Sequence, residues 1–427
     1  MFKKSIMIFL ITMVLVIILQ NKYSFAADSN EVNLTKTPDN ASQLNATRIT
    51  PVLDTKINTG ENLIYCSTFQ MAWNSLCQDI LKGETAEIEN APDYVKTLNN
   101  LINELANVSD DSYVAMGGLS QDNIVERFNK ALLEKFKDVD TKELPIIKDK
   151  FGHDQILIFA YLNKLMPFEH EFQKTKPILF QSNKESWVKS FGLDYYNSRN
   201  ESHENILKQL DIVYYFDYGE FSKSVKDNNI DTITLFKNGL NPKTGLIIKL
   251  KTKSEDDLVI STLSPLNTFL DTFFDIDNRI NNPSTYRYLN DSIPLEIKNN
   301  ITNNFFNIKT LKPDESIRIP NIKIKIDHFY SELEKKSFLN KQLLKNNYYI
   351  EKAFQDVKFL LNEKGVILSS SVRILMKMGR SDEHKIYLVD KPFVIYLRSK
   401  NSNYPYFMAY IQNPYLLVMP NNNEDIF

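Results

Sequence analysis

The segment Lys391–Pro414, KPFVIYLRSKNSNYPYFMAYIQNP, constrains the fold of this chain more than any other segment. Two apolar runs, Phe393–Leu397 and Tyr406–Ile411, flank a polar turn at Lys400–Asn403. Apolar runs of this length on either side of a turn predict a β-hairpin that is buried on both faces. Other strands and helices must therefore cover both sides of this hairpin.

Composition fits a globular protein and disfavours two functional classes. The chain has 427 residues, of which 43% are apolar and 24% charged, enough for one large domain or two ordinary ones. A formal charge of -2 gives no electrostatic reason to expect nucleic acid as a partner. The chain contains only 11 glycines and neither a GxGxxG nor a GxxxxGK[ST] motif. Nucleotide enzymes are therefore disfavoured, and we expect no cofactor.

Residues 1–26 have the pattern of a secretory signal peptide. Two lysines near the start precede an apolar core at Ile6–Leu19, and Ser24–Ala26 has the small-x-small pattern of a cleavage site. The polar residues 27–47 then predict a flexible leader. We expect a secreted, extracellular protein with no membrane contact after signal cleavage. An uncleaved N-terminal anchor is the alternative.

Cys66 and Cys77 are the only cysteines. A continuous helix between them would separate them by about 16 Å, too far for a disulfide, so we predict two buried free thiols. A cysteine hydrolase using Cys66 at a helix N-terminus is a less favoured alternative, because the five histidines form no recognisable pairing motif. His203-Glu204 begins an HExxH zinc motif that fails at Leu207. We therefore predict neither a catalytic residue nor a metal site.

The apolar pattern changes from helical to strand-like along the chain. Helices are predicted over Phe69–Ile80, Tyr94–Leu105 and Asn123–Phe136. Strands are predicted over Ile156–Leu162, Ile212–Tyr215, Leu246–Leu250, Leu258–Leu263, Ile317–Ile326 and Ala353–Asn362. Early helices and later strands predict the α+β class. No repeat or linker divides the chain, so we expect one domain over residues 48–420, and a monomer.

Two segments at opposite ends of the chain resemble the serpin family. Residues 62–85, NLIYCSTFQMAWNSLCQDILKGET, resemble its opening N-[VI]-[FY]-[FIVL]-S-P-x-S strand and helix, which K-G-x-T closes. Residues 391–414 resemble its last hairpin, with Pro-Phe, Phe-Met and Asn-Pro in order. Weaker matches lie at 111–136, 157–172 and 351–366. A divergent, secreted, bacterial-type serpin would have N-terminal helices packed on a large β-sheet, a central C-terminal hairpin and an exposed reactive loop.

The resemblance implies inhibition of a serine-type, or cysteine, endopeptidase. A serpin offers a loop as bait, and the cleaved loop enters the sheet as a new strand together with the trapped protease. The loop would occupy residues 365–385, and its hinge would comprise Glu363, Gly365, Val366, Leu368 and Ser370. Counting from Glu363 and from Pro392 places the cleaved bond within Lys377, Met378, Gly379, Arg380 and Ser381. Arg380 would suit an extracellular, trypsin-like protease.

Several positions depart from the family pattern. Cys66, Ser67, Phe69, Ala160 and Gln355 replace the residues of a polar cluster beneath the serpin sheet, so this cluster is expected to be lost. Only residues 137–152 separate the third helix from the next strand, so the helix that covers the sheet is expected to be nearly absent. The hinge carries Leu368 where serpin inhibitors have a small residue. The alternative is a non-inhibitory serpin-fold protein with a binding or structural role.

Overall fold

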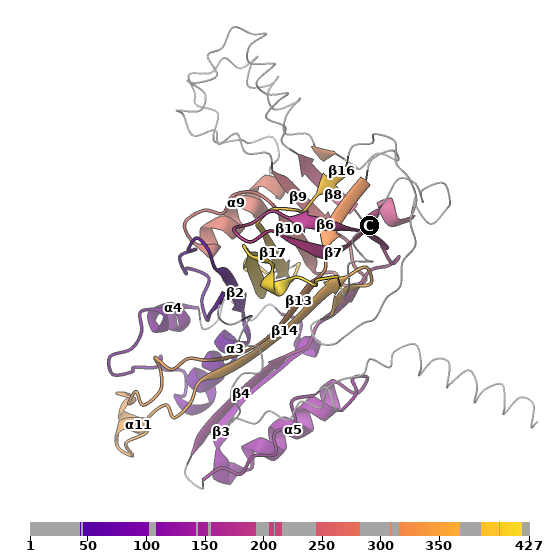
Figure 1. Cartoon of the computed structure of the whole chain (residues 1–427). Coiled ribbons are helices and arrows are strands. Elements are labelled where there is room, and N and C mark those ends of the chain that lie inside the picture. Colours follow the sequence, from indigo (N-terminus) through magenta and orange to yellow (C-terminus); the bar gives the residue numbers. More distant parts are fainter. Residues whose placement is uncertain are drawn as a thin grey trace, which may run out of the picture.

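The structure is a computed structural model of the chain (Figure 1). It describes residues 43, 46–101, 108–141, 144–152, 155–193, 205–208, 210–215, 245–281, 308–309, 316–367, 386–400 and 402–420.

The C-terminal hairpin lies in the middle of the largest sheet, as the two apolar runs predict. In order across the sheet, the strands are β1 (Thr47–Thr50), β2 (Asn62–Cys66), β18 (Phe407–Ile411), β17 (Phe393–Arg398), β10 (Asp257–Ser261), β9 (Leu246–Leu250), β8 (Leu210–Tyr215) and β11 (Ile308–Lys309). All residues of β18 are buried, and so are all residues of β17 except Arg398. The predicted hairpin is therefore confirmed, and it pairs with β2 from the other end of the chain.

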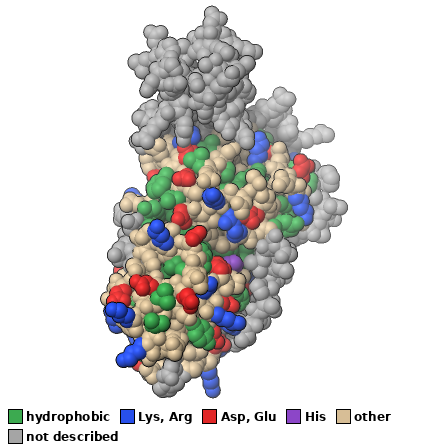
Figure 2. Space-filling model, turned by 90° about the vertical axis from the view of Figure 1, so that its left-hand side faces the viewer, with side chains coloured by type: hydrophobic (Ala, Val, Ile, Leu, Met, Phe, Trp, Pro, Cys, Tyr) green, Lys and Arg blue, Asp and Glu red, His purple; other side chains and the backbone are tan. Residues whose placement is uncertain are grey.

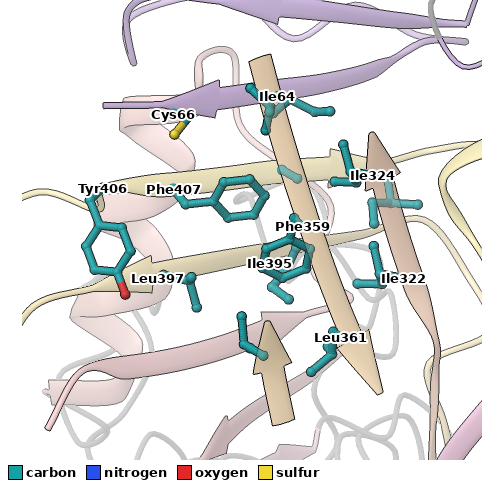
Figure 3. Close-up of a cluster of buried hydrophobic side chains, with 14 of the residues drawn as sticks. Ile64, Cys66, Ile322, Ile324, Phe359, Leu361, Ile395, Leu397, Tyr406 and Phe407 are labelled. Carbon is teal, nitrogen blue, oxygen red and sulfur yellow. The ribbon is translucent and has the colours of Figure 1, made fainter. Parts of the chain in front are cut away.

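Both faces of this sheet are covered. On one face, helix α9 (Phe269–Asn281) packs against Tyr396, Met408 and Tyr410. On the other face, β14 (Phe354–Asn362) crosses the hairpin (Figure 3). The ring of Phe359 on β14 stacks on that of Phe407, with centroids 4.4 Å apart and planes 7° apart. The core thus forms where sheets and helices bury alternate faces of the same strands.

Three smaller sheets complete the fold. One contains β16 (Ile386–Leu388), β12 (Ser316–Pro320), β7 (Ser186–Leu193) and β6 (Gln173–Phe180). The second contains β13 (Ile322–Phe329), β14, β15 (Gly365–Ile367) and β5 (Leu165–Pro167), and the third β3 (Tyr113–Leu119) and β4 (Ile156–Leu162). The mixture of helices and sheets confirms the α+β class.

The single strand predicted over Ile317–Ile326 is wrong. The segment forms two strands, β12 and β13, which belong to different sheets. The isoleucines alternate at 317 and 319 but then resume at 322, one position out of phase. A strand must keep a period of two to hold one face against the core. The chain therefore changes sheet at Pro320-Asn321.

The predicted first helix is divided in two, as α3 (Thr68–Ser75) followed by a π-helical turn, η1 (Leu76–Ile80). Cys66 lies at the end of β2, before this helix. Helix α4 spans Tyr94–Asn100, so the last part of the predicted Tyr94–Leu105 helix extends beyond the described residues. The remaining helices are the 3₁₀ turns η2 (Asp110–Ser112), η3 (Ser120–Asp122) and η5 (Pro414–Leu416), the short α11 (Lys341–Leu344), and α5 (Ile124–Lys135).

Helix α5 covers one face of the two-stranded sheet formed by β3 and β4. Phe128, Leu132 and Phe136 pack against one face of β3 and β4, where Phe128 and Phe159 lie with ring centroids 5.0 Å apart. The opposite face of the same two strands packs against α3 and η1, through residues such as Ala160. The helix predicted over Asn123–Phe136 thus covers these two strands, and the described part of residues 137–152 contains no helix. None of the described helices is long and apolar enough to cross a membrane.

Candidate functional site

The candidate site is the junction where β14 turns into β15. Residues Glu363 and Lys364 form a tight turn, and Gly365 then pairs back with Asn362. On its other side β15 pairs with β5, so that Val366 lies opposite both Leu361 and Met166. Residues 365–367 are therefore a short strand inserted between β14 and β5. Of the predicted hinge residues, the structure brings Glu363, Gly365 and Val366 together here.

Position 365 requires a glycine, because of both its backbone conformation and its surroundings. Its φ is +128°, a region that residues with a side chain rarely adopt. A Cβ atom built here would lie 2.4 Å from the carbonyl oxygen of Met166 and 2.7 Å from Cα of Pro167. Both contacts are with the backbone of β5, which cannot rotate away as a side chain can. Glycine thus permits the close approach that starts the inserted strand.

Val366 sets which side of the inserted strand faces the core. Its side chain is fully buried, as is that of Met166 opposite. Beneath them, the hydroxyl of Tyr406 lies 3.4 Å from Sδ of Met166 and donates to Asp256 Oδ2 at 3.0 Å. Burial, followed by the charge of Asp256, raises the pKa of Tyr406 well above its ordinary value. Beneath the junction, the neutral hydroxyl of Tyr406 therefore donates a hydrogen bond to the buried carboxylate of Asp256.

The acid beneath the junction is neutralised by a lysine. Nζ of Lys164 lies 2.9 Å from Asp256 Oδ2, and only 13% and 7% of the two side chains are exposed. Lys164 belongs to the short segment between β4 and β5. A buried ion pair of this kind leaves a costly unpaired charge when one partner is removed. It fixes the position of β5, along which β15 pairs.

Glu363 is buried in the turn without a close partner. Its side chain is only 4% exposed, and neither carboxylate oxygen has a hydrogen-bond partner among the described residues. Nζ of Lys174 on β6 lies 3.9 Å from Oε1 of Glu363. Burial lowers the pKa of Lys174, and the charge of Glu363 opposes this shift. The carboxylate is thus held by a long ion pair and by the turn, whose carbonyls accept from Phe168 and Phe172.

Beyond β15, two strand edges have no partner among the described residues. β14 pairs with β13 over residues 354–361, but with β15 only at residues 360–362. β4 pairs with β3 alone. β5 follows β4 along the chain, and β15 lies between β5 and β14, so both edges continue strands that flank β15. We call residues 354–359 and 156–162 the open edges.

A polar network lies beneath the open edge of β14, and of the five positions that depart from the family pattern it includes Gln355 and the backbone carbonyl of Cys66. The buried amide of Gln355 donates to Thr68 Oγ1 at 2.7 Å and to the carbonyl oxygen of Cys66 at 3.0 Å. Its oxygen accepts from the hydroxyl of Tyr330 at 2.7 Å. The network joins β14 to the start of α3 and to the end of β13. Sequence comparison missed it because Thr68 and Tyr330 are not at the family positions.

Cys66 does not have the surroundings of a nucleophile. It is buried, its Sγ accepts from the Thr68 hydroxyl at 3.6 Å, and burial raises the pKa of its thiol. A raised pKa disfavours the reactive thiolate. Cys77 is also buried, with a pKa raised to about 11 by burial. Both cysteines are free, as predicted.

No metal site was expected from the sequence. The described residues contain no cluster of three or more His, Cys, Asp or Glu side chains that could hold a metal ion. Of the five histidines, His153, His203 and His384 lie outside the described residues.

The predicted reactive residues lie outside the described part of the chain. These are Lys377, Met378, Gly379, Arg380 and Ser381, together with the hinge residues Leu368 and Ser370. The chain re-enters the described structure at Ile386, where β16 pairs with β12. Both ends of the predicted loop are thus anchored in sheets.

Comparison with known proteins gives similarity in structure alone. No protein-family model and no curated protein sequence matches the chain. A solved structure of Serpin48 from the insect Tenebrio molitor matches with a TM-score of 0.39 and 11% identity, over 82% of this chain and 92% of that one. A serpin from the trematode Schistosoma haematobium matches with a TM-score of 0.40 and 12% identity, over 83% and 95%.

Human thyroxine-binding globulin in complex with its hormone matches with a TM-score of 0.41 and 8% identity, over 83% of this chain and 92% of that one. The similar structures thus include proteins named as serpins, the family that the two terminal motifs resemble. At this level of identity and TM-score, the similarity assigns neither a function nor a binding residue to this chain.

Proposed function

We propose that this chain is a secreted, serpin-like inhibitor of an extracellular serine-type endopeptidase. The proposal rests on the sequence motifs at the two ends and on one structural observation. β15 begins a strand between β14 and β5, and beyond Ile367 the edges of β14 and β4 have no strand partner among the described residues. A bait loop that inserts after cleavage needs such an entry point. The protein would act as an inhibitor and not as an enzyme.

The pairing register specifies which residues would insert. Ile367 lies opposite Leu360 on β14 and opposite Leu165 on β5. Continued along β14, this register would bring Val372 opposite Gln355. Continued along β4, it would bring Met376 opposite Ile156, where β4 begins. The open edges would therefore accept residues 368–376 and stop just before the predicted reactive residues.

The side-chain pattern of this segment suits insertion. Because Val366 faces the core, the residues at alternate positions after it would face the core too. These are Leu368, Ser370, Val372, Ile374 and Met376, which include neither a charge nor a proline. Each large apolar side chain buried would contribute about 1.5–3 kcal/mol before the loss of chain entropy. The charged Arg373 and Lys377 fall on the opposite side.

Recognition would depend on the loop. Lys and Arg side chains are interspersed with Asp and Glu over the coloured part of the face in Figure 2, without a broad area of one sign. Such a surface provides little long-range steering of a charged protease. Arg380 would enter an acidic specificity pocket of a trypsin-like enzyme, and the bond after it would be cleaved.

The test is incubation of the mature protein with trypsin, followed by a denaturing gel and mass spectrometry. An inhibitor gives a covalent band at the summed mass of both proteins and a cleavage site after Arg380. Arg380→Gln should abolish this band, with Lys377→Gln as the control for a neighbouring basic residue. Clean fragments without a covalent band would contradict inhibition.

Insertion is tested separately by melting curves before and after cleavage. Cleavage should raise the melting temperature of the wild type, because residues 368–376 become buried. Val372→Asp should prevent this rise, since a buried unpaired charge is costly. Arg373→Asp, on the opposite side, should preserve it. An unchanged melting temperature after cleavage of the wild type would show that the loop does not insert.

A non-inhibitory, serpin-fold binding protein is the second candidate. The observation in its favour is the Gln355 network, which ties the open edge of β14 to α3 and opposes separation of the strands. In that case the loop would be cleaved like any exposed segment, without trapping. A cysteine hydrolase is disfavoured by the burial and raised pKa of Cys66.

A further inference from the structure

Two like-charged pairs face each other across β13 and β14. In the antiparallel register, Asp327 lies opposite Asp356, and Lys325 lies opposite Lys358. Positions two apart on a strand share a face, so the four side chains form a quartet on the face that points away from the Gln355 network. Directly opposed like charges destabilise a strand pair. This arrangement needs a compensating interaction.

Lys358 compensates part of the repulsion. Nζ of Lys358 lies 2.8 Å from Asp356 Oδ2, and the two side chains are 20% and 24% exposed. The other carboxylate oxygen, Oδ1 of Asp356, is buried and has no hydrogen-bond donor among the described residues. An acceptor that is removed from water without a donor is unfavourable. A proton on the facing carboxyl group of Asp327 would supply the donor.

The geometry points to a proton-operated clasp: Asp327, when protonated, donates a hydrogen bond to Asp356, and when ionised it repels Asp356 and loosens β13 from β14. Burial, followed by the charge of Asp356, raises the pKa of Asp327 to about 6, while Lys358 and Lys325 act in the opposite direction. The proton therefore binds in the range between neutral and mildly acidic conditions.

The clasp lies on the strand that borders the open edges. Asp356 is next to Gln355 in β14, and a tighter β13–β14 pair would hold the open edge of β14 in place. The inference about the clasp itself stands on these two strands alone. Its effect on the rate of loop insertion rests on the proposed function.

The pH dependence has a defined sign. The pKa of Asp327 is raised in the folded state, so the folded protein binds the proton more tightly than the unfolded chain. The stability that protonated Asp327 contributes is therefore fully present below the pKa of about 4 that an Asp has in the unfolded chain. It is lost as the pH rises through about 6. The β13–β14 pair should become more stable as the pH falls from 7 to about 4.5.

A nearby histidine titrates with the opposite sign. His328 follows Asp327 but points to the other face, where its ring packs edge-on against Tyr330 at 4.6 Å. Burial lowers its pKa, which Glu332 opposes. Protonation of His328 on acidification would therefore destabilise the fold. Acidification should therefore stabilise the fold through Asp327 and destabilise it through His328, so the two groups can be told apart.

The test is hydrogen exchange by mass spectrometry of peptides from β13 and β14 between pH 4.5 and 7.5, corrected for intrinsic exchange rates. In the His328→Gln background, protection should rise about tenfold on acidification, because tighter proton binding by the folded strand pair favours its closed state. Asp327→Asn, which keeps a donor at every pH, should give high and pH-independent protection. Asp122→Asn, an exposed acid beside α5, serves as the control and should retain the rise.

A second variant keeps the test decisive. Asp356→Asn removes the facing charge and should make the rise smaller without abolishing it, because burial, the larger cause of the raised pKa of Asp327, remains. If Asp327→Asn and the parent show the same pH profile, the clasp is wrong. If the clasp behaves as expected but cleavage never raises the melting temperature, the proposed inhibition fails and the clasp stands.

Discussion

The side chains of Asn62 and Asn413 join the two ends of the folded chain. Nδ2 of Asn62 donates to Asn413 Oδ1 at 2.7 Å, and Asn62 Oδ1 accepts from the backbone amides of Gln412 and Asn413 at 2.8 and 3.0 Å. Both side chains are buried. The two residues come from the two terminal segments that resemble serpins, one at the start of β2 and one just after β18. The motif asparagines therefore meet and hold the central hairpin against β2.

Asn62→Ala and Asn413→Ala should each destabilise the fold by about 1–3 kcal/mol, because each leaves buried partners without a hydrogen bond. The free energy of unfolding should be measured by denaturant titration. Asn58→Ala, which removes an exposed hydrogen bond to Glu61, is the control and should have little effect. The double variant should cost less than the sum of the single changes, because one shared interaction is lost once. Full additivity would contradict a direct link.

Gly365→Ala should weaken the junction more than an ordinary glycine substitution. The change forces a side chain into both an unfavourable φ and the backbone of β5. Gly83→Ala is the matched control, because Gly83 has φ +95° but no atom within 4 Å of the added Cβ. The control should cost about 1–2 kcal/mol, and Gly365→Ala about 1–3 kcal/mol more for overpacking. If denaturant titration gives equal losses in the free energy of unfolding for the two variants, the backbone of β5 moves to accommodate the added Cβ atom.

The elements that sequence predicted correctly are those with a strong local pattern. The hairpin at 393–411 was predictable because each strand is a continuous apolar run, which only burial on both faces explains. The Asn123–Phe136 helix was predictable from one apolar face. That this helix covers β3 and β4 was not predictable, because the apolar face of a helix does not specify which sheet it packs against. The strand break at Pro320 was hidden by an apparently continuous isoleucine pattern.

The candidate site was predictable in position but not in its contacts. Glu363 and Gly365 were found by a local motif, and their neighbours in β5 come from about 200 residues earlier in the chain. The Gln355 network was not predicted, because its other side chains lie outside the family positions. Tyr330 and Thr68 approach Gln355 from separate elements, which no single-sequence pattern reveals. Asp327 and Asp356 likewise became a pair only through strand register.

Tyr330→Phe should destabilise the fold although it keeps the aromatic ring in place. The change removes the donor to Gln355 Oε1 at a buried position, which should cost about 1–3 kcal/mol. Tyr349→Phe is the control, because Tyr349 is 55% exposed, and its melting temperature should match the wild type. If the second candidate function is wrong and the loop inserts, Tyr330→Phe should also speed insertion after cleavage. An unchanged stability would exclude the hydrogen bond as a structural link.

Met408→Asp should prevent folding, because it places a charge at the centre of the largest sheet. Met408 is fully buried between β2 and β17, and it packs against α9. A buried carboxylate without a partner costs several kcal/mol, a large part of the roughly 5–15 kcal/mol that stabilises a typical domain. Met408→Leu keeps the volume and should cost less than about 1.5 kcal/mol. Circular dichroism and gel filtration of both variants would decide the matter, since a folded, monomeric Met408→Asp protein would mean that this hairpin lies at a solvated edge and not in the core.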